Sequence, residues 1–167
     1  GDLLAASRHL MFARDTGEVV LAGVVRVVGG RLAVRADRLD LKLTDGKPVE
    51  AVFRGLDGHS VEAELHDPGA AGCRESLGLA ALRVLRAPGI RILFDPDGEA
   101  RTLRPLDPVV LEGFDPPDRL WRMKAKSMVA TLARGGRIER IEATSVDGTT
   151  EDGGRTLRAP RIHLAFD

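Results

Sequence analysis

The chain has 167 residues, which is the size of one domain with room for a sizeable hydrophobic core. Hydrophobic residues make up 43% of it and charged residues 30%, so a wholly disordered or fibrous chain is excluded. The 25 basic and 25 acidic residues cancel, which leaves no positive field for nucleic acid. The longest apolar run, at 19–25, is far short of the roughly 20 residues that span a bilayer.

The first residues, GDLLAAS, lack the basic and apolar regions of a signal peptide, so we expect that any signal or anchor has already been removed. Predicted strands then begin around Leu10 and Phe12, followed by a turn at 15–17 and a return strand over 19–28. The turn with glycine between two apolar segments is typical of a hairpin.

The segment 34–43 predicts a bent strand. Its apolar residues alternate with polar ones, but one extra residue follows Ala36, so the apolar side chains change face at that point. Such an insertion predicts a bulge or corner where a strand passes from one sheet into another, with the small alanine on the inside of the bend. A hairpin turn at 44–47 and a return strand over 49–52 follow.

The middle of the chain is less regular. Residues 61–65 alternate as a strand, and 74–85 is the one helical candidate, with a strand expected from Val84 onward. Seven prolines lie between 67 and 118, so we predict an irregular segment there. Cys73, the single cysteine, excludes an internal disulfide and is expected to be a spectator thiol in a loop.

The pattern of 34–43 recurs at 85–95, 123–132 and 157–167. The segments 85–95 and 157–167 are identical at seven of eleven positions. Repeats of this kind indicate one architecture built from a repeated unit of bent strand, tight turn and return strand. We therefore predict a single all-β domain over 1–167, with about ten or more antiparallel strands.

Two segments carry a resemblance to a known family. The run GRLAVRADRLDLKL at 30–43, followed by Asp45, Gly46 and a return strand, resembles the repeated segment of OstA-like proteins. The run DTGEVVLAGVVRV at 15–27 resembles the turn and the glycine-containing return strand of that family. The resemblance covers 8–66 and 119–167, and it departs at Pro88 and Pro160, which replace the Asp37 of the first copy.

The OstA-like family includes the LptA-like and LptC-like components of lipopolysaccharide transport. The resemblance implies a folded-over β-jellyroll that holds the acyl chains of lipopolysaccharide or a related lipid in its apolar interior. It also implies edge-strand pairing with other OstA-like proteins or a second copy, and a periplasmic location in a Gram-negative bacterium. The chain would be free there, or anchored to the inner membrane through a segment outside this sequence.

Stacked bent strands would line a groove with aliphatic side chains, which suits acyl chains because apolar burial is non-directional. Trp121 is two residues before Met123 in an alternating strand, so its side chain is expected on the same side of the strand, toward the groove. The alternative is that the inward-facing apolar residues form the closed core of a structural or protein-interaction module. The candidate lipid-binding residues are Val34, Leu39, Leu41, Leu43, Ile90, Ile92, Phe94, Trp121, Met123, Met128, Leu132, Ile162, Leu164 and Phe166.

The sequence gives little support for a metal site or a catalytic site. His59, Glu62, Glu64 and His66 could form an exposed metal site, but a solvated strand face is the favoured interpretation, and His163 is also expected to be exposed. We predict no catalytic residue, no metal and no cofactor, and hence no enzyme. A cupin-like metal enzyme is the weakest alternative.

Overall fold

The computed structural model describes residues 3–29, 32–65, 82–115, 119–136, 138–150 and 154–165. Within these ranges the chain forms one antiparallel sheet of 14 strands, which confirms the all-β prediction. The strands are β1 (Leu3–Ala6), β2 (His9–Ala13), β3 (Glu18–Gly29), β4 (Leu32–Thr44), β5 (Lys47–Arg54), β6 (Val61–Leu65), β7 (Leu82–Ala87), β8 (Gly89–Phe94), β9 (Ala100–Pro105), β10 (Val109–Asp115), β11 (Arg119–Ala125), β12 (Ser127–Leu132), β13 (Ile138–Thr150) and β14 (Thr156–Ala165).

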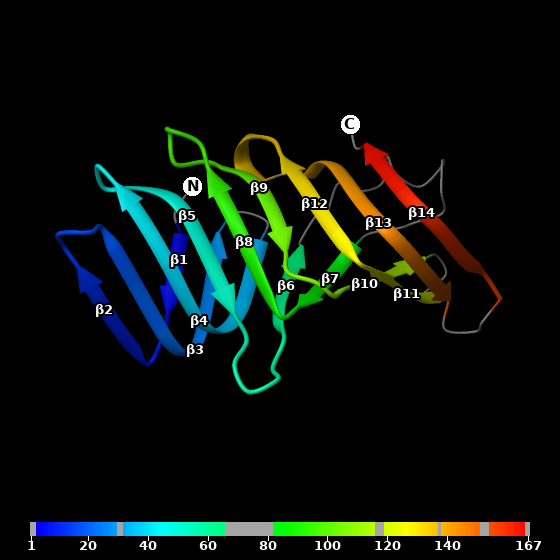
Figure 1. Cartoon of the computed structure of the whole chain (residues 1–167), viewed down its shortest axis with the longest axis horizontal. Coiled ribbons are helices and arrows are strands. Elements are labelled where there is room, and N and C mark those ends of the chain that lie inside the picture. The colour runs from blue at the N-terminus through cyan, green and yellow to red at the C-terminus, as the bar shows by residue number, and fades with distance from the viewer. Residues whose placement is uncertain are drawn as a thin grey trace.

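The sheet is folded over into two layers. β4 shows how: its residues 38–44 pair with β5, whereas its residues 32–35 pair with β6. β13 does the same, pairing with β12 through 138–144 and with β11 through 147–150. The long strands therefore cross from a front layer containing β5, β8, β9 and β12 into a back layer containing β6, β7, β10 and β11, which lies behind it in Figure 1.

Each crossing is a corner at the predicted place. In β4 the buried positions run through Val34 and Ala36, then shift by one residue to Leu39. Opposite this point the register of β3 and β4 is broken between Ala22 and Val25. The extra residue re-aims the side chains, so both halves of the strand keep their apolar face toward the interior.

The alanines before the corners are buried, as the repeat predicts. Ala36, Ala87 and Ala125 are each almost fully enclosed, and Ala159 in the last copy is half-buried. The cross-strand partners of these three alanines, Val25, Val61 and Val109, are completely buried. Small side chains on the inside of each bend let the two layers approach closely.

Prolines lie where ladder hydrogen bonds are not needed. Pro88 separates β7 from β8 at a corner, and Pro160 faces the interruption in the β13–β14 register at Ser145. A proline has no N–H to donate, so it fits a corner better than the middle of a ladder.

The predicted hairpins are present. The turn between β4 and β5 has positive φ angles at Asp45 (52°) and Gly46 (75°), the geometry favoured for two-residue hairpins. The turn between β12 and β13 is a short 3₁₀ segment at Arg134–Gly136. The turn at 15–17 joins β2 to β3.

The middle of the chain differs from one expectation. The predicted helix over 74–85 is wrong for 82–85, which belong to strand β7, whereas the strand expected from Val84 onward is confirmed. The backbone of β7 pairs with β6 and β10. The remainder of that helix, together with Cys73 and His66, lies outside the described residues. Leu82–Asp115 of the segment 67–118 forms the four strands β7 to β10. Among the described residues, no helix is long and apolar enough to cross a membrane.

Candidate functional site

The space between the layers is apolar along the whole length of the molecule. Cross-strand neighbours of the front layer place Leu41 beside Ala51, Ala51 beside Ile92 and Ile92 beside Leu103. The row continues through Ala130 and Ile141 to Leu164 of β14. Among the described residues, Thr150 is the single polar residue in the buried set.

The structure brings the predicted lipid-binding residues to this interior, from both layers. Eight are buried: Val34, Leu39, Ile90, Ile92, Trp121, Met123, Met128 and Leu132. Five are half-buried: Leu41, Leu43, Phe94, Ile162 and Leu164. Phe166 lies outside the described residues.

The half-buried side chains gather on one side of the interior. They lie toward the hairpin turns of the front layer. On the other side of the interior, the corner valines Val25, Val61 and Val109 are completely buried. We call the half-buried set the tip-side stripe. It consists of Val19, Leu41, Phe94, Ala100, Ile138, Ile162 and Leu164, all packed against the buried core.

The interior is open at the N-terminal end. Leu10 and Phe12 of β2 pair with Leu21 and Val19, so they continue the inward-facing rows of β3. Nevertheless Leu10 is 66% exposed and Phe12 is 56% exposed. β2 pairs with β3 on one side, and within the described residues no strand pairs with its other side. The apolar interior thus continues to an uncovered edge.

Several of these positions are not in the predicted set. Leu10 and Phe12 were predicted to belong to a strand, but their exposure follows from the lack of a neighbour, which alternation cannot reveal. Val19, Ala100 and Ile138 of the stripe carry the same alternation as their neighbours and could have been included on that signal. Thr150 could not, because a threonine in a strand gives no indication of burial.

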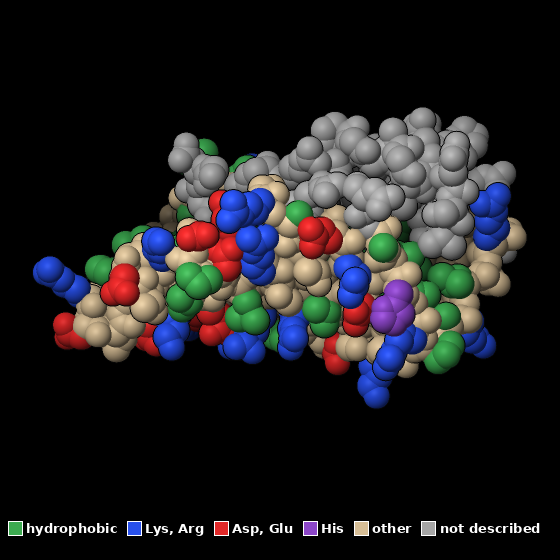
Figure 2. All heavy atoms as spheres, turned by 90° about the horizontal axis from the view of Figure 1, so that it is seen from above, with side chains coloured by type: hydrophobic (Ala, Val, Ile, Leu, Met, Phe, Trp, Pro, Cys, Tyr) green, Lys and Arg blue, Asp and Glu red, His purple; other side chains and the backbone are tan. Residues whose placement is uncertain are grey.

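The outward faces are charged. Glu112 of β10 lies between Arg86 of β7 and Arg122 of β11, and Arg122 Nη2 is 2.7 Å from Glu112 Oε1. Arg86 Nε also donates to Glu62 Oε1 over 2.8 Å. Burial alone would raise the pKa of Glu112, but the hydrogen bonds from the two arginines outweigh it and hold that pKa below its usual value. Figure 2 shows charged side chains of both signs along the visible face.

The polar residues considered for metal binding are engaged elsewhere. His59 lies in the loop between β5 and β6, where its Nδ1 is 3.1 Å from Asp37 Oδ2. The backbone N–H of Leu56 donates to the same carboxylate and, together with His59, lowers the pKa of Asp37. Glu62 bonds to Arg86, and His163 is exposed near Glu142. Among the described residues, no three His, Cys, Asp or Glu side chains are grouped to hold a metal ion.

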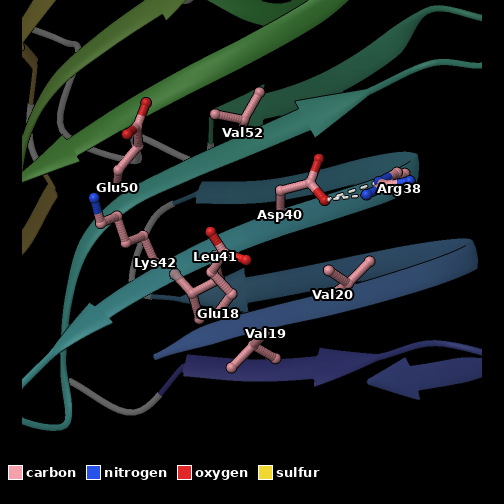
Figure 3. A pocket seen from close by; sticks show the side chains of 9 residues that line it. All are labelled: Glu18, Val19, Val20, Arg38, Asp40, Leu41, Lys42, Glu50 and Val52. Atoms are coloured by element: carbon pink, nitrogen blue, oxygen red, sulfur yellow. Dashed lines mark hydrogen bonds and ion pairs between the residues drawn. The ribbon is translucent and has the colours of Figure 1, made fainter. Parts of the chain in front are cut away.

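A hollow of about 440 Å³ lies on the outward side of β3, β4 and β5. Figure 3 shows that it is lined by both signs of charge, with Arg38 bound to Asp40. Arg38 Nη2 is 2.7 Å from Asp40 Oδ1. Charged walls of this kind do not suit an acyl chain, although Val19 and Leu41, which pack against the core, also border the hollow.

Comparison with known proteins decides the fold type. No protein-family model matches the sequence, and no curated protein matches it significantly. Among solved structures, LptH of Pseudomonas aeruginosa matches with a TM-score of 0.55 and 12% sequence identity. The match covers 99% of this chain and 96% of LptH, which is described as the LptA-homologous periplasmic component of the conserved lipopolysaccharide transport device. The chain has an LptA-like fold.

The LptA-like fold agrees with the sequence resemblance to OstA-like proteins and extends it. The resemblance covers 8–66 and 119–167, whereas the structural match includes nearly the whole chain. The LptA-like fold also accounts for the corners, because a folded-over sheet requires each long strand to change layer. β7 to β10 therefore continue the same architecture through the middle segment.

Proposed function

We propose that this chain is a non-enzymatic module that carries lipopolysaccharide acyl chains in its apolar interior, as part of a bridge across the periplasm of a Gram-negative bacterium. The observation that carries the proposal is the uncovered end of the interior. The inward-facing Leu10 and Phe12 are exposed at an edge strand, so the apolar rows extend to a surface where another module can continue them.

The tip-side stripe is the proposed path of the acyl chains. Its residues are half-buried, whereas the corner residues are packed too closely for a ligand to enter without separating the layers. Aliphatic walls bind flexible chains without fixed polar partners, since the gain comes from removing apolar surface from water. The fold shared with LptH, itself a component of lipopolysaccharide transport, supports this choice of lipid.

The two ends of the sheet are the proposed bridging surfaces. β1 and β2 lie at one end of the long axis in Figure 1 and β14 lies at the other. Unpaired strand edges present N–H and C=O groups that can extend a sheet into another chain. A second copy, or another protein with an LptA-like fold, would pair head to tail through these edges.

The first test is direct detection of lipid. The protein is purified from Gram-negative cells, and bound lipid is identified by native mass spectrometry and thin-layer chromatography. Lipid-free protein is then titrated with lipopolysaccharide while Trp121 emission is followed. We expect co-purifying lipid and a change in emission. The absence of bound lipid together with an unchanged spectrum at saturating lipopolysaccharide would overturn the carrier proposal.

The second candidate function is a structural or protein-interaction module with a closed core. The complete burial of Val25, Val61 and Ile90 favours it. In that case edge-mediated association persists while lipid binding is absent, so the same lipid titration, combined with sedimentation, separates the two candidates.

A further inference from the structure

Trp121 carries an unpaired hydrogen-bond donor inside the apolar interior. The residue is 6% exposed, and within the part of the chain that the structure describes its indole Nε1 has no hydrogen-bond partner. Buried indole N–H groups normally find an acceptor, because a donor removed from water without one is unfavourable. The side chain lies on the same inward face of β11 as Met123, which is also buried.

The neighbours of Trp121 do not supply the acceptor. Its cross-strand partners are Gly113 of β10, which has no side chain, and Thr150 of β13. The Thr150 hydroxyl is already engaged, since its oxygen accepts from the backbone N–H of Arg155 over 3.0 Å. Among the described residues the donor is therefore unpaired, in a region whose other buried side chains are apolar apart from Thr150.

We propose that Trp121 Nε1 donates a hydrogen bond to the carbonyl oxygen of an ester-linked or amide-linked acyl chain. This inference rests on the proposed function, and it adds a specificity-determining residue to the lipid site. The acyl carbonyl is placed beside Trp121, toward the end of β11 away from the corner at Ala125, and its methylene chain continues along the tip-side stripe. The site thereby distinguishes acyl chains from plain alkyl chains.

The chemistry of the surroundings selects a neutral acceptor. Among the described residues the buried set contains no basic side chain that could offset an anion. A phosphate or free carboxylate next to Trp121 would carry an uncompensated charge in an apolar site. An ester or amide carbonyl accepts a hydrogen bond without bringing a charge, and it is covalently attached to the chain that the aliphatic walls bind.

The test uses two lysophospholipids of equal chain length, one with an ester-linked hexadecanoyl chain and one with an ether-linked hexadecyl chain. The single tryptophan gives one indole N–H signal in a ¹H–¹⁵N spectrum. We expect this signal to move downfield with the ester lipid and not with the ether lipid. We also expect the wild-type protein to bind the ester lipid roughly tenfold more tightly, the net effect of one neutral hydrogen bond at the upper end of its range.

Trp121→Phe removes the donor and keeps an aromatic ring. This variant should bind both lipids within about twofold of each other, and it should bind lipopolysaccharide roughly tenfold more weakly than the wild type. Phe53→Leu is the matched control, because it alters a buried aromatic residue of the front layer that has no donor. Phe53→Leu should retain the preference for the ester lipid.

The outcomes separate this inference from the proposed function. If the wild type binds lipopolysaccharide but Trp121→Phe binds it equally well, the role of Trp121 is overturned and the carrier function stands. Equal affinity of the wild type for the ester and ether lipids overturns the role of Trp121 in the same way. If the wild type binds neither lipopolysaccharide nor either lysophospholipid, the proposed function itself fails.

Discussion

Gly148 of β13 lies directly against Met123 of β11, its cross-strand partner. A Cβ atom on Gly148 would be 2.6 Å from Met123 Cγ, closer than real Cβ contacts come. The methionine side chain therefore occupies the space that any other residue at 148 would need. This pair fixes how closely β11 and β13 pack in the back layer.

We predict that Gly148→Ala lowers the free energy of unfolding by about 1–3 kcal/mol, because overpacking forces Met123 from its position. The measurement is chemical denaturation of the wild type, Gly148→Ala, Met123→Ala and the double variant. The two effects should be non-additive by about 0.5–3 kcal/mol, since removing the Met123 side chain makes room for the alanine. Additive free energies would contradict the steric explanation.

Leu41 and Lys42 are adjacent in β4 but face opposite sides of the sheet, and they provide a matched pair for the lipid site. Leu41 packs against the buried core as part of the tip-side stripe, whereas Lys42 is exposed, and both border the outer hollow. Leu41→Gln should weaken lipopolysaccharide binding by roughly tenfold, because it places an amide against acyl chains. Lys42→Gln should leave binding unchanged. Calorimetric titration measures both, and an equal loss in the two variants would contradict the assignment of the stripe.

Head-to-tail pairing predicts concentration-dependent association in solution. β14 pairs with β13 on one side, and within the described residues no strand covers its other edge. His163→Pro should reduce association, because proline distorts an edge and removes a donor. Sedimentation velocity over a range of concentrations measures the effect, with thermal unfolding as a check that the fold is retained. A wild type that stays monomeric at high concentration would contradict the bridging proposal.

The Glu112 ion-pair network predicts a loss of stability in acid. Arg86 and Arg122 hold the pKa of Glu112 below its unfolded-state value of about 4.3. This group therefore stabilises the fold fully above that pH, and its contribution is lost as the pH falls through the lower, folded-state pKa. Denaturation midpoints between pH 5 and pH 2 should fall less steeply for Glu112→Gln than for the wild type. Parallel curves would show that Glu112 does not contribute.

The bent strands and their corners could be predicted because they depend on local patterns. A shift in alternation after Ala36, together with the Asp45 and Gly46 turn, gives both the corner and the hairpin of one unit. In the segment 82–85, the repeat predicted a strand only from Val84 onward. The strand begins earlier, at Leu82, because β7 pairs with β6 and β10 on its two sides.

Alternation with period two and its reversal at a corner are properties of one strand, so they predict which side chains share the interior face. The folded structure was needed to show which strands become neighbours, such as β11 beside β13, since local alternation carries no information about backbone pairing between distant segments. The folded structure also shows that, within the described residues, Phe12 is exposed at an edge that no strand covers and the Trp121 donor has no acceptor. Exposure and hydrogen bonding depend on what the rest of the chain places around a residue, and this is settled only when the sheet has folded over.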